Sequence, residues 1–252
     1  MTGWFNWAFN VFPHLQLALN NIYAKMGGKW NREQHIYINN AIQSNLVWAI
    51  NHIKAFNSIH ILKSIAWTPS IANFVIYCDT CPEGMGFLYP ISKDGYYAPT
   101  PTNVPSNVIF YFECLCVLSA LADVQTKAPH GSKILIYTDN ANTVDIFHTL
   151  HCLPAYNHLL QRAVDIIMAK DFSLCVLHVP GDQNVVADTL SHVQFSVALT
   201  KEPNLNLFTF HPPSLVGSTK WFTVIDTLDS LSGRPGLETS YSEKDQLLLD
   251  MP

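Results

Sequence analysis

The stretch Val75-Ile76-Tyr77-Cys78-Asp79 decides how the rest of the chain is interpreted. Its β-branched and aromatic residues, followed by a carboxylate, predict a buried strand that delivers Asp79 to a sheet edge or cleft. A turn containing Gly84 comes next, and the apolar run 85–91 predicts a second strand that forms a hairpin with the first. The shorter run 96–99 favours a third strand.

Two later runs, 134–139 and 172–179, repeat the buried-strand pattern. Between and after them, apolar residues recur at helical spacing. Strands that alternate with helices are typical of parallel crossovers. The sequence therefore predicts an α/β fold, with an antiparallel hairpin joined to a parallel portion in one mixed sheet that helices cover. The expected helices span 111–124, 140–150, 156–170 and 184–193.

The two ends of the chain differ from this middle part. Residues 13–26 and 31–56 show helical periodicity and predict a helical hairpin, with Asn31 and Gln34 as a capping pair. The aromatic residues of 4–12 could form an interface, but we interpret them as the core of this hairpin. After 193 the pattern fades among Pro, Gly, Ser and Thr. The expected domains are a helical, thumb-like connection segment (1–70), an α/β domain (71–193) and a linker or poorly ordered tail (194–252).

Composition narrows the possible classes of protein. Hydrophobic residues make up 48% of the 252 residues and charged residues 13%, which excludes wholesale disorder. No apolar run reaches the roughly 18 residues of a membrane span, and the first residues lack a signal-peptide pattern, so no membrane partner is expected. Six Cys within apolar patterns favour reduced thiols in an intracellular protein, either cytoplasmic or nuclear.

The net charge of −5 is unevenly distributed. Residues 1–70 carry five basic residues and one acidic residue, whereas residues 71–192 carry five basic and eleven acidic residues. An acidic middle segment argues against simple electrostatic binding of nucleic acid. Metal ions that cancel part of this charge would remove the objection.

Four carboxylates can be placed around the first strand. Asp79 and Asp139 each end a strand, Glu113 lies in the first turn expected for the helix 111–124, and Asp188 lies in the last helix. Four carboxylates at one place repel one another unless cations neutralise them. Hard oxygen ligands suit Mg²⁺ or Mn²⁺, and two such ions about 4 Å apart can activate water and stabilise a leaving oxygen. The pattern therefore indicates a metal-dependent nuclease site.

Several short motifs together resemble a known family. They are Cys78-Asp79 before Gly84-x-Gly86, Glu113 in a helix, Thr138-Asp139-Asn140, His178-Val179-Pro180-Gly181, and Asn184-Val185-Val186-Ala187-Asp188-Thr189-Leu190-Ser191. Residues 72–193 resemble the ribonuclease H domain of retrotransposon reverse transcriptases. The closing motif is the most specific, and it is similar to that of fungal LTR and tyrosine-recombinase elements. Residues 10–67 resemble the segment between polymerase and ribonuclease H in such fungal polyproteins.

The resemblance implies a ribonuclease H-like fold, with a five-stranded mixed sheet whose first three strands are antiparallel. It implies endonucleolytic cleavage of the RNA strand of an RNA–DNA hybrid, with two Mg²⁺ or Mn²⁺ ions. Contacts to 2′-hydroxyls would select RNA over DNA. The polymerase part of the same polyprotein is the other expected partner. The metal ligands and catalytic residues would be Asp79, Glu113, Asp139 and Asp188.

The chain departs from the family at two places. His192 replaces the usual Arg after Leu-Ser, and the loop 180–183 lacks the mobile His of cellular ribonucleases H. No Tyr-x-Asp-Asp polymerase motif is present, so we expect no polymerase activity from this chain.

Other polar residues have more ordinary interpretations. Asn140 and Asn184 are expected to cap helices or contact substrate, and the acidic residues Asp145 and Asp182 to be solvated. Glu83 is interpreted as a turn residue. The pair Cys78-x-x-Cys81 could suggest zinc, but it lacks a correctly spaced partner pair, so incidental thiols are favoured. His178 and His192 are expected to be structural.

Three functions compete. The first is an active hybrid-specific ribonuclease. The second is a catalytically silent transposon-derived fragment that acts as a nucleic-acid-binding or structural module. The third is another nuclease with the same fold, an integrase core or a proofreading exonuclease. Integrases usually carry Glu where Asp188 stands, and proofreading exonucleases carry Asp-x-Glu, whereas Thr80-Cys81 follow Asp79. The four intact carboxylates favour the first function.

Overall fold

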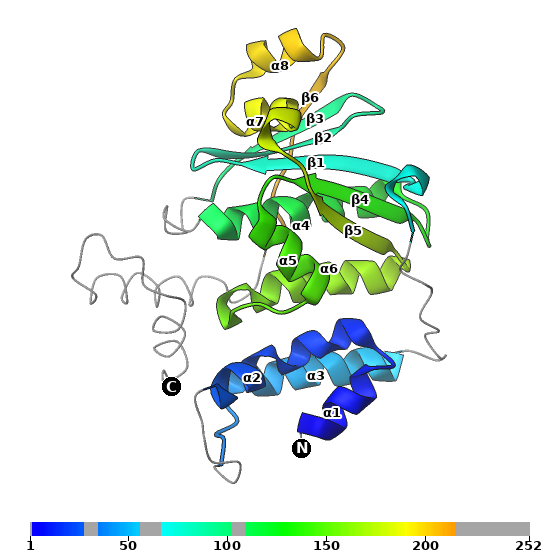
Figure 1. Cartoon of the computed structure of the whole chain (residues 1–252), viewed down its shortest axis with the longest axis vertical. Coiled ribbons are helices and arrows are strands. Elements are labelled where there is room, and N and C mark those ends of the chain that lie inside the picture. Colours follow the sequence, from blue (N-terminus) through cyan, green and yellow to red (C-terminus); the bar gives the residue numbers. More distant parts are fainter. Residues whose placement is uncertain (1, 28–34, 56–66, 102–108, 215–252) are drawn as a thin grey trace, which may run out of the picture. The chain divides into compact units, whose positions relative to one another are not determined.

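A computed structural model describes residues 2–27, 35–55, 67–101 and 109–214 (Figure 1). The chain divides into two compact units. Of the described residues, the first contains 2–27, 35–55 and 150–157, and the second contains 67–101, 109–149 and 158–214. The two units are described separately below.

The second unit is built on a six-stranded sheet in the order β5-β4-β1-β2-β3-β6. β1 pairs antiparallel with β2, and β2 pairs antiparallel with β3. β4 is parallel to β1, and β5 is parallel to β4. These five strands confirm the predicted α/β class and the ribonuclease H-like mixed sheet. The strand bounds are β1 (Phe74–Thr80), β2 (Gly84–Tyr89), β3 (Asp94–Pro99), β4 (Lys133–Thr138), β5 (Ser173–His178) and β6 (Asn206–Thr209).

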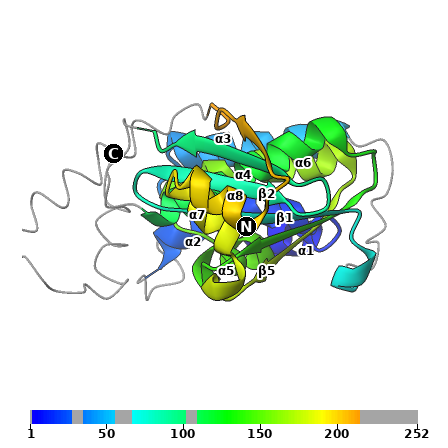
Figure 2. The same cartoon turned by 90° about the horizontal axis from the view of Figure 1, so that it is seen from above.

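Helices cover both faces of this sheet. The chain adds α4 (Ile109–Lys127), α5 (Ala141–Thr149), α6 (Asn157–Lys170), α7 (Val185–Ser191) and α8 (Phe195–Lys201). In Figures 1 and 2, α4 and α7 lie on opposite sides of β1 and β2. Side chains alternate along β1, so Cys78 is buried near Cys116 of α4. Tyr77, one residue away, packs instead with Leu190 of α7.

Helix α4 begins earlier than predicted. It starts at Ile109, so Glu113 lies beyond its first turn and not in it. Among the described residues, α4 is the helix whose length and mean hydropathy would suffice for a membrane span. Two thirds of that stretch is buried inside the unit, which accounts for its apolar composition. It is the core helix of the sheet.

The prediction of a tail after residue 193 is wrong for residues 195–209. Helix α8 follows α7, and β6 adds a sixth strand that pairs in parallel with β3. The backbone N–H of Asn206 donates to the carbonyl of Lys93, and the Lys93 ammonium lies 2.9 Å from the Glu202 carboxylate. All four residues of β6 are exposed at the sheet edge. A four-residue strand without a buried position differs from the buried-strand pattern of the earlier runs, so it was not recognised from the sequence.

The first unit is helical, as the sequence predicts. Its described elements are α1 (Thr2–Phe9), the 3₁₀ helices η1 (Pro13–Leu19) and η3 (Pro154–Tyr156), α2 (Asn20–Met26) and α3 (Asn40–Ala55). The predicted start of the second helix at 31 and its capping pair lie outside the described residues. Helix α3 itself begins at Asn40, where the Asn39 side chain accepts the Ile42 N–H.

The first unit differs from the prediction in two further ways. Phe9 is buried, but Trp4 and Trp7 are 77% and 69% exposed, so the core interpretation of the N-terminal aromatics is wrong for both tryptophans. Residues 150–157 also belong to this unit. They are held by the Asn20 amide, which donates to the Leu150 carbonyl and to the Asn157 side chain.

Candidate active site

Asp79 is the most enclosed member of the carboxylate group. It lies near the end of β1 and is 5% exposed. The Ser191 hydroxyl of α7 donates to Asp79 Oδ2 at 2.6 Å. Burial and the nearby charges of Asp139 and Asp188 raise the pKa of Asp79 to about 6, although the Ser191 hydrogen bond lowers it. The carboxylate is thus held in one orientation between β1 and α7.

Two glycines of β2 allow α7 to lie this close. A Cβ atom at Gly84 would clash with the Ser191 carbonyl oxygen. One at Gly86 would lie 2.7 Å from the Leu190 Cβ and 2.8 Å from the Ser191 N. Any side chain at these two positions would push the helix away from the sheet. The glycines therefore set the distance from α7 to β1, and with it the Ser191–Asp79 hydrogen bond.

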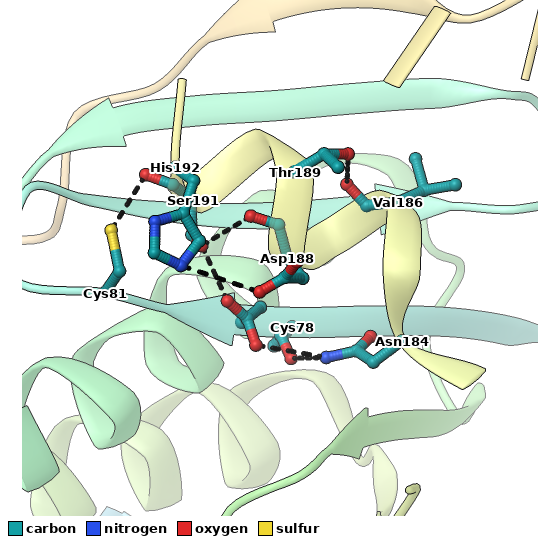
Figure 3. Close-up of polar contacts among 9 residues, drawn as sticks. Cys78, Cys81, Asn184, Val186, Asp188, Thr189, Ser191 and His192 are labelled. Atoms are coloured by element: carbon teal, nitrogen blue, oxygen red, sulfur yellow. Dashed lines mark hydrogen bonds and ion pairs between the residues drawn. The ribbon is translucent and has the colours of Figure 1, made fainter. Parts of the chain in front are cut away.

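Asn184 supports Asp79 from the other side. Its side chain is almost fully buried, and its Nδ2 donates to the Cys78 carbonyl at 2.9 Å and to Asp79 Oδ1 at 3.4 Å (Figure 3). Asn184 occupies the predicted N-cap position of α7 without the capping hydrogen bond of its side chain, and its contact with substrate stays a prediction. Asn184 positions Asp79 instead.

Glu113 reaches the site from α4. It is 6% exposed and lies where Asp79 and Asp139 act on it. Burial, followed by the charges of these two residues, raises the pKa of Glu113 to about 9, although a hydrogen bond with Thr138 lowers it. Its Oε2 is buried and has no hydrogen-bond partner among the described residues. A buried oxygen without a partner is costly unless something outside the chain binds it.

Asp139 and Asp188 form the open side of the site. Asp139 follows β4, which runs parallel to β1, and Asp188 lies in α7; both are exposed. A Cβ at Gly181 would lie 3.5 Å from Asp139 Oδ2, so the 180–183 loop passes beside this carboxylate. Asp139 contributes to the raised pKa of both buried carboxyls, and Asp188 to that of Asp79. Asp79 therefore interacts electrostatically with each of the other three predicted carboxylates.

These features fit divalent cations. The donor set consists of hard carboxylate oxygens, two of them buried and two open to solvent. Without cations, burial and mutual repulsion keep Glu113 protonated at neutral pH, where its pKa is about 9, and favour the protonated form of Asp79 below its pKa of about 6. A divalent ion would replace those protons and bind the unpartnered Glu113 oxygen. Asp79, Glu113, Asp139 and Asp188 are the residues that would hold it.

The predictions for the remaining polar residues near the site are confirmed only in part. The Asn140 side chain accepts the Thr143 N–H at 3.0 Å, which confirms the predicted cap of α5, while its contact with substrate stays a prediction. His192 is exposed at the end of α7, with its Nε2 3.6 Å from Asp188 Oδ1. Sequence reasoning missed Ser191 as a partner of Asp79. Its only signal was its place in the closing Leu-Ser motif.

Comparisons with known proteins are limited to structures. No family model matches the chain, and no curated protein matches it. Among solved structures, the chain is similar to LC11-RNase H1, isolated from compost by a metagenomic approach, with 20% identity and a TM-score of 0.39. That match covers 50% of this chain and 97% of the other. The RNase H1 of the halophilic archaeon Halobacterium salinarum matches with 17% identity and a TM-score of 0.35, covering 50% and 98%.

Proposed function

We propose that this chain is a metal-dependent endonuclease that cleaves the RNA strand of RNA–DNA hybrids. The observation that carries the proposal is the site itself: Asp79 and Glu113 buried, Asp139 and Asp188 exposed, and a Glu113 oxygen that lacks a partner. The strand end, core helix, second strand end and late helix supply these carboxylates in the order that the motifs predict.

Two bound Mg²⁺ or Mn²⁺ ions would supply Lewis-acid activation of water and of the scissile phosphate. The chain's own contribution is to hold the carboxylates. The Ser191 hydroxyl and the Asn184 amide fix the two oxygens of Asp79, while the packing of α4 fixes Glu113. Asp139 and Asp188 face solvent, where a phosphodiester can approach. Rigid placement of the ligands before substrate binds lowers the reorganisation needed in the reaction.

We further propose that the chain works as the ribonuclease H part of a retrotransposon reverse transcriptase, inside the cell, in the cytoplasm or the nucleus. The closing motif 184–191 and the resemblance of residues 10–67 to a connection segment support this context. The polymerase part of the same polyprotein would then be its partner. Asn140, next to Asp139, would contact the hybrid.

The proposal is tested with the full chain and a labelled RNA–DNA hybrid. With Mg²⁺ or Mn²⁺ we expect cleavage of the RNA strand, no cleavage of duplex DNA and no cleavage in chelator. Asp79→Asn and Asp139→Asn should each abolish cleavage and leave the circular dichroism spectrum unchanged. Asp145→Asn, which neutralises an exposed carboxylate of α5, is the control and should cleave normally. Undiminished cleavage by both site variants would refute the assignment, and no cleavage by the wild type would favour the silent fragment.

A further inference from the structure

A second group of metal-binding side chains lies beside the carboxylates. Cys81 directly follows β1, Glu83 belongs to the turn before β2, and His192 ends α7. One ligand atom from each residue lies within 4.8 Å of the other two. Cys81 is buried, whereas Glu83 and His192 are exposed, so the group is open to solvent on one side. The proposed hydrolysis uses none of these side chains.

The backbone around this group is already fixed. Cys81 and Gly84 exchange two backbone hydrogen bonds across the turn. The Cys81 thiol donates to the Ser191 carbonyl at 3.1 Å, which ties the turn to the end of α7 (Figure 3). To enclose an ion, the two exposed side chains would turn toward it, and the metal bond would replace the thiol hydrogen bond of Cys81. A preformed cluster lowers the ordering cost of binding.

The third ligand, His192, lies beside a carboxylate. In Figure 3 its imidazole lies between the Cys81 sulfur and the Asp188 side chain, and its Nε2 is 3.6 Å from Asp188 Oδ1. In the neutral tautomer that carries its proton on Nε2, toward Asp188, Nδ1 is unprotonated and able to bind a metal. Carboxylate–histidine–metal arrangements are common around zinc, where the carboxylate fixes the tautomer and ring orientation.

The donor set distinguishes this group from the nuclease site. Sulfur, imidazole nitrogen and one carboxylate oxygen suit Zn²⁺, whose bonds to such ligands are about 2.0–2.3 Å. In a tetrahedral site the ligand atoms then lie roughly 3.5 Å apart. The rotations available to the exposed Glu83 and His192 side chains can bring this group to that spacing. The nuclease site offers oxygen alone and suits harder ions.

We propose that Cys81, Glu83 and His192 form a second metal site that binds Zn²⁺ or a chemically similar ion, with water as the fourth ligand. Binding replaces the thiol proton, which passes to the buffer. The bound ion links the β1–β2 turn to the end of α7, the helix that carries Asp188 and Ser191. Cys78 is excluded from the site because its side chain is buried near Cys116 of α4. The Cys78-x-x-Cys81 spacing is thus incidental.

The test is a titration of the full chain with Co²⁺ in the presence of excess Mg²⁺. Thiolate-bound Co²⁺ has a near-ultraviolet charge-transfer absorption that carboxylate-bound Co²⁺ lacks. We expect this absorption at one equivalent, removed by Zn²⁺ and not by Mg²⁺. Cys81→Ser should abolish it, and His192→Ala and Glu83→Gln should each weaken Co²⁺ binding by at least about tenfold.

Matched controls keep the result specific. Cys175→Ser and His178→Ala change the same residue types elsewhere in the unit and should bind Co²⁺ as the wild type does. Glu83→Gln lies in an exposed turn, so it reports on the site even where Cys81→Ser does not fold. An absent charge-transfer band, or binding unchanged in both Glu83→Gln and His192→Ala, would overturn the proposal. Because the readout is spectroscopic, failure of the hybrid-cleavage assay does not affect it.

Discussion

Replacement of Glu113 by glutamine should stabilise the metal-free protein while it removes nuclease activity. Glutamine keeps the shape of the side chain but carries no charge. Glu113 is buried beside Asp79 and Asp139, and its ionised form is disfavoured there. The wild-type protein must therefore either keep this carboxyl protonated or bury a charge in the absence of metal. The variant does neither, but it lacks the anionic oxygen that a cation needs.

The magnitude follows from the pKa. In the unfolded chain Glu113 has the ordinary pKa of 4.5, and in the folded protein the value is about 9. Between these values the folded state binds more protons than the unfolded state, so its stability falls as pH rises through this range. At pH 7 the loss is 2.5 pH units at about 1.4 kcal/mol each, or about 3.5 kcal/mol. Below pH 4.5 the loss vanishes.

Urea unfolding in chelator at pH 5, 7 and 8.5 measures this effect. The difference in free energy of unfolding between Glu113→Gln and wild type should be below about 1 kcal/mol at pH 5, about 3.5 kcal/mol at pH 7 and larger at pH 8.5. Asp145→Asn, at an exposed position, should show no such rise. A Glu113→Gln difference that is constant across pH would refute the reasoning, because packing effects do not depend on protonation.

Three further predictions concern the same site. Gly86→Ala would place a Cβ 2.7 Å from the Cβ of Leu190 and shift α7. The free energy of unfolding in urea should fall by about 1–3 kcal/mol, and cleavage activity should be lost. A variant as stable as the wild type would contradict this prediction. Ser191→Ala removes the hydrogen bond that lowers the pKa of Asp79, so the acid limb of the pH–rate profile should move to higher pH. An unmoved limb would exclude the role of Ser191 in setting this pKa. Binding of Mg²⁺ should release protons, because the pKa values of Asp79 and Glu113 are raised to about 6 and about 9. Calorimetry at pH 7 in two buffers with different ionisation heats should therefore give different apparent enthalpies, and equal enthalpies would contradict the prediction.

The strands that carry the site could be predicted because their signals are local. Asp79 and Asp139 each stand at the end of a buried apolar run, and parallel pairing of β1 and β4 brings those ends together. Glu113 could be placed on its helix but not in the correct turn. Sequence signals for the ends of helices are weak, and α4 begins earlier than predicted. The mixed sheet followed from the alternation of strands and helices.

Other features depend on contacts between distant residues and had no local signal. The Asn184 amide resembled a helix cap in sequence, yet tertiary packing turns it toward β1. The roles of Gly84 and Gly86 become visible only when α7 lies against β2. Strand β6 has four residues, all of them exposed, so it does not show the long buried run that marks β1 and β4. The chain after 193 therefore resembled a linker although part of it completes the sheet.

The central claim is that four carboxylates from separate elements bind two divalent ions. Anomalous X-ray scattering from crystals of the Mn²⁺-loaded chain with an RNA–DNA hybrid measures this most directly. The account predicts two peaks about 4 Å apart, bounded by Asp79, Glu113, Asp139 and Asp188, at the scissile phosphate. Well-ordered crystals with no peak among these four residues would contradict it.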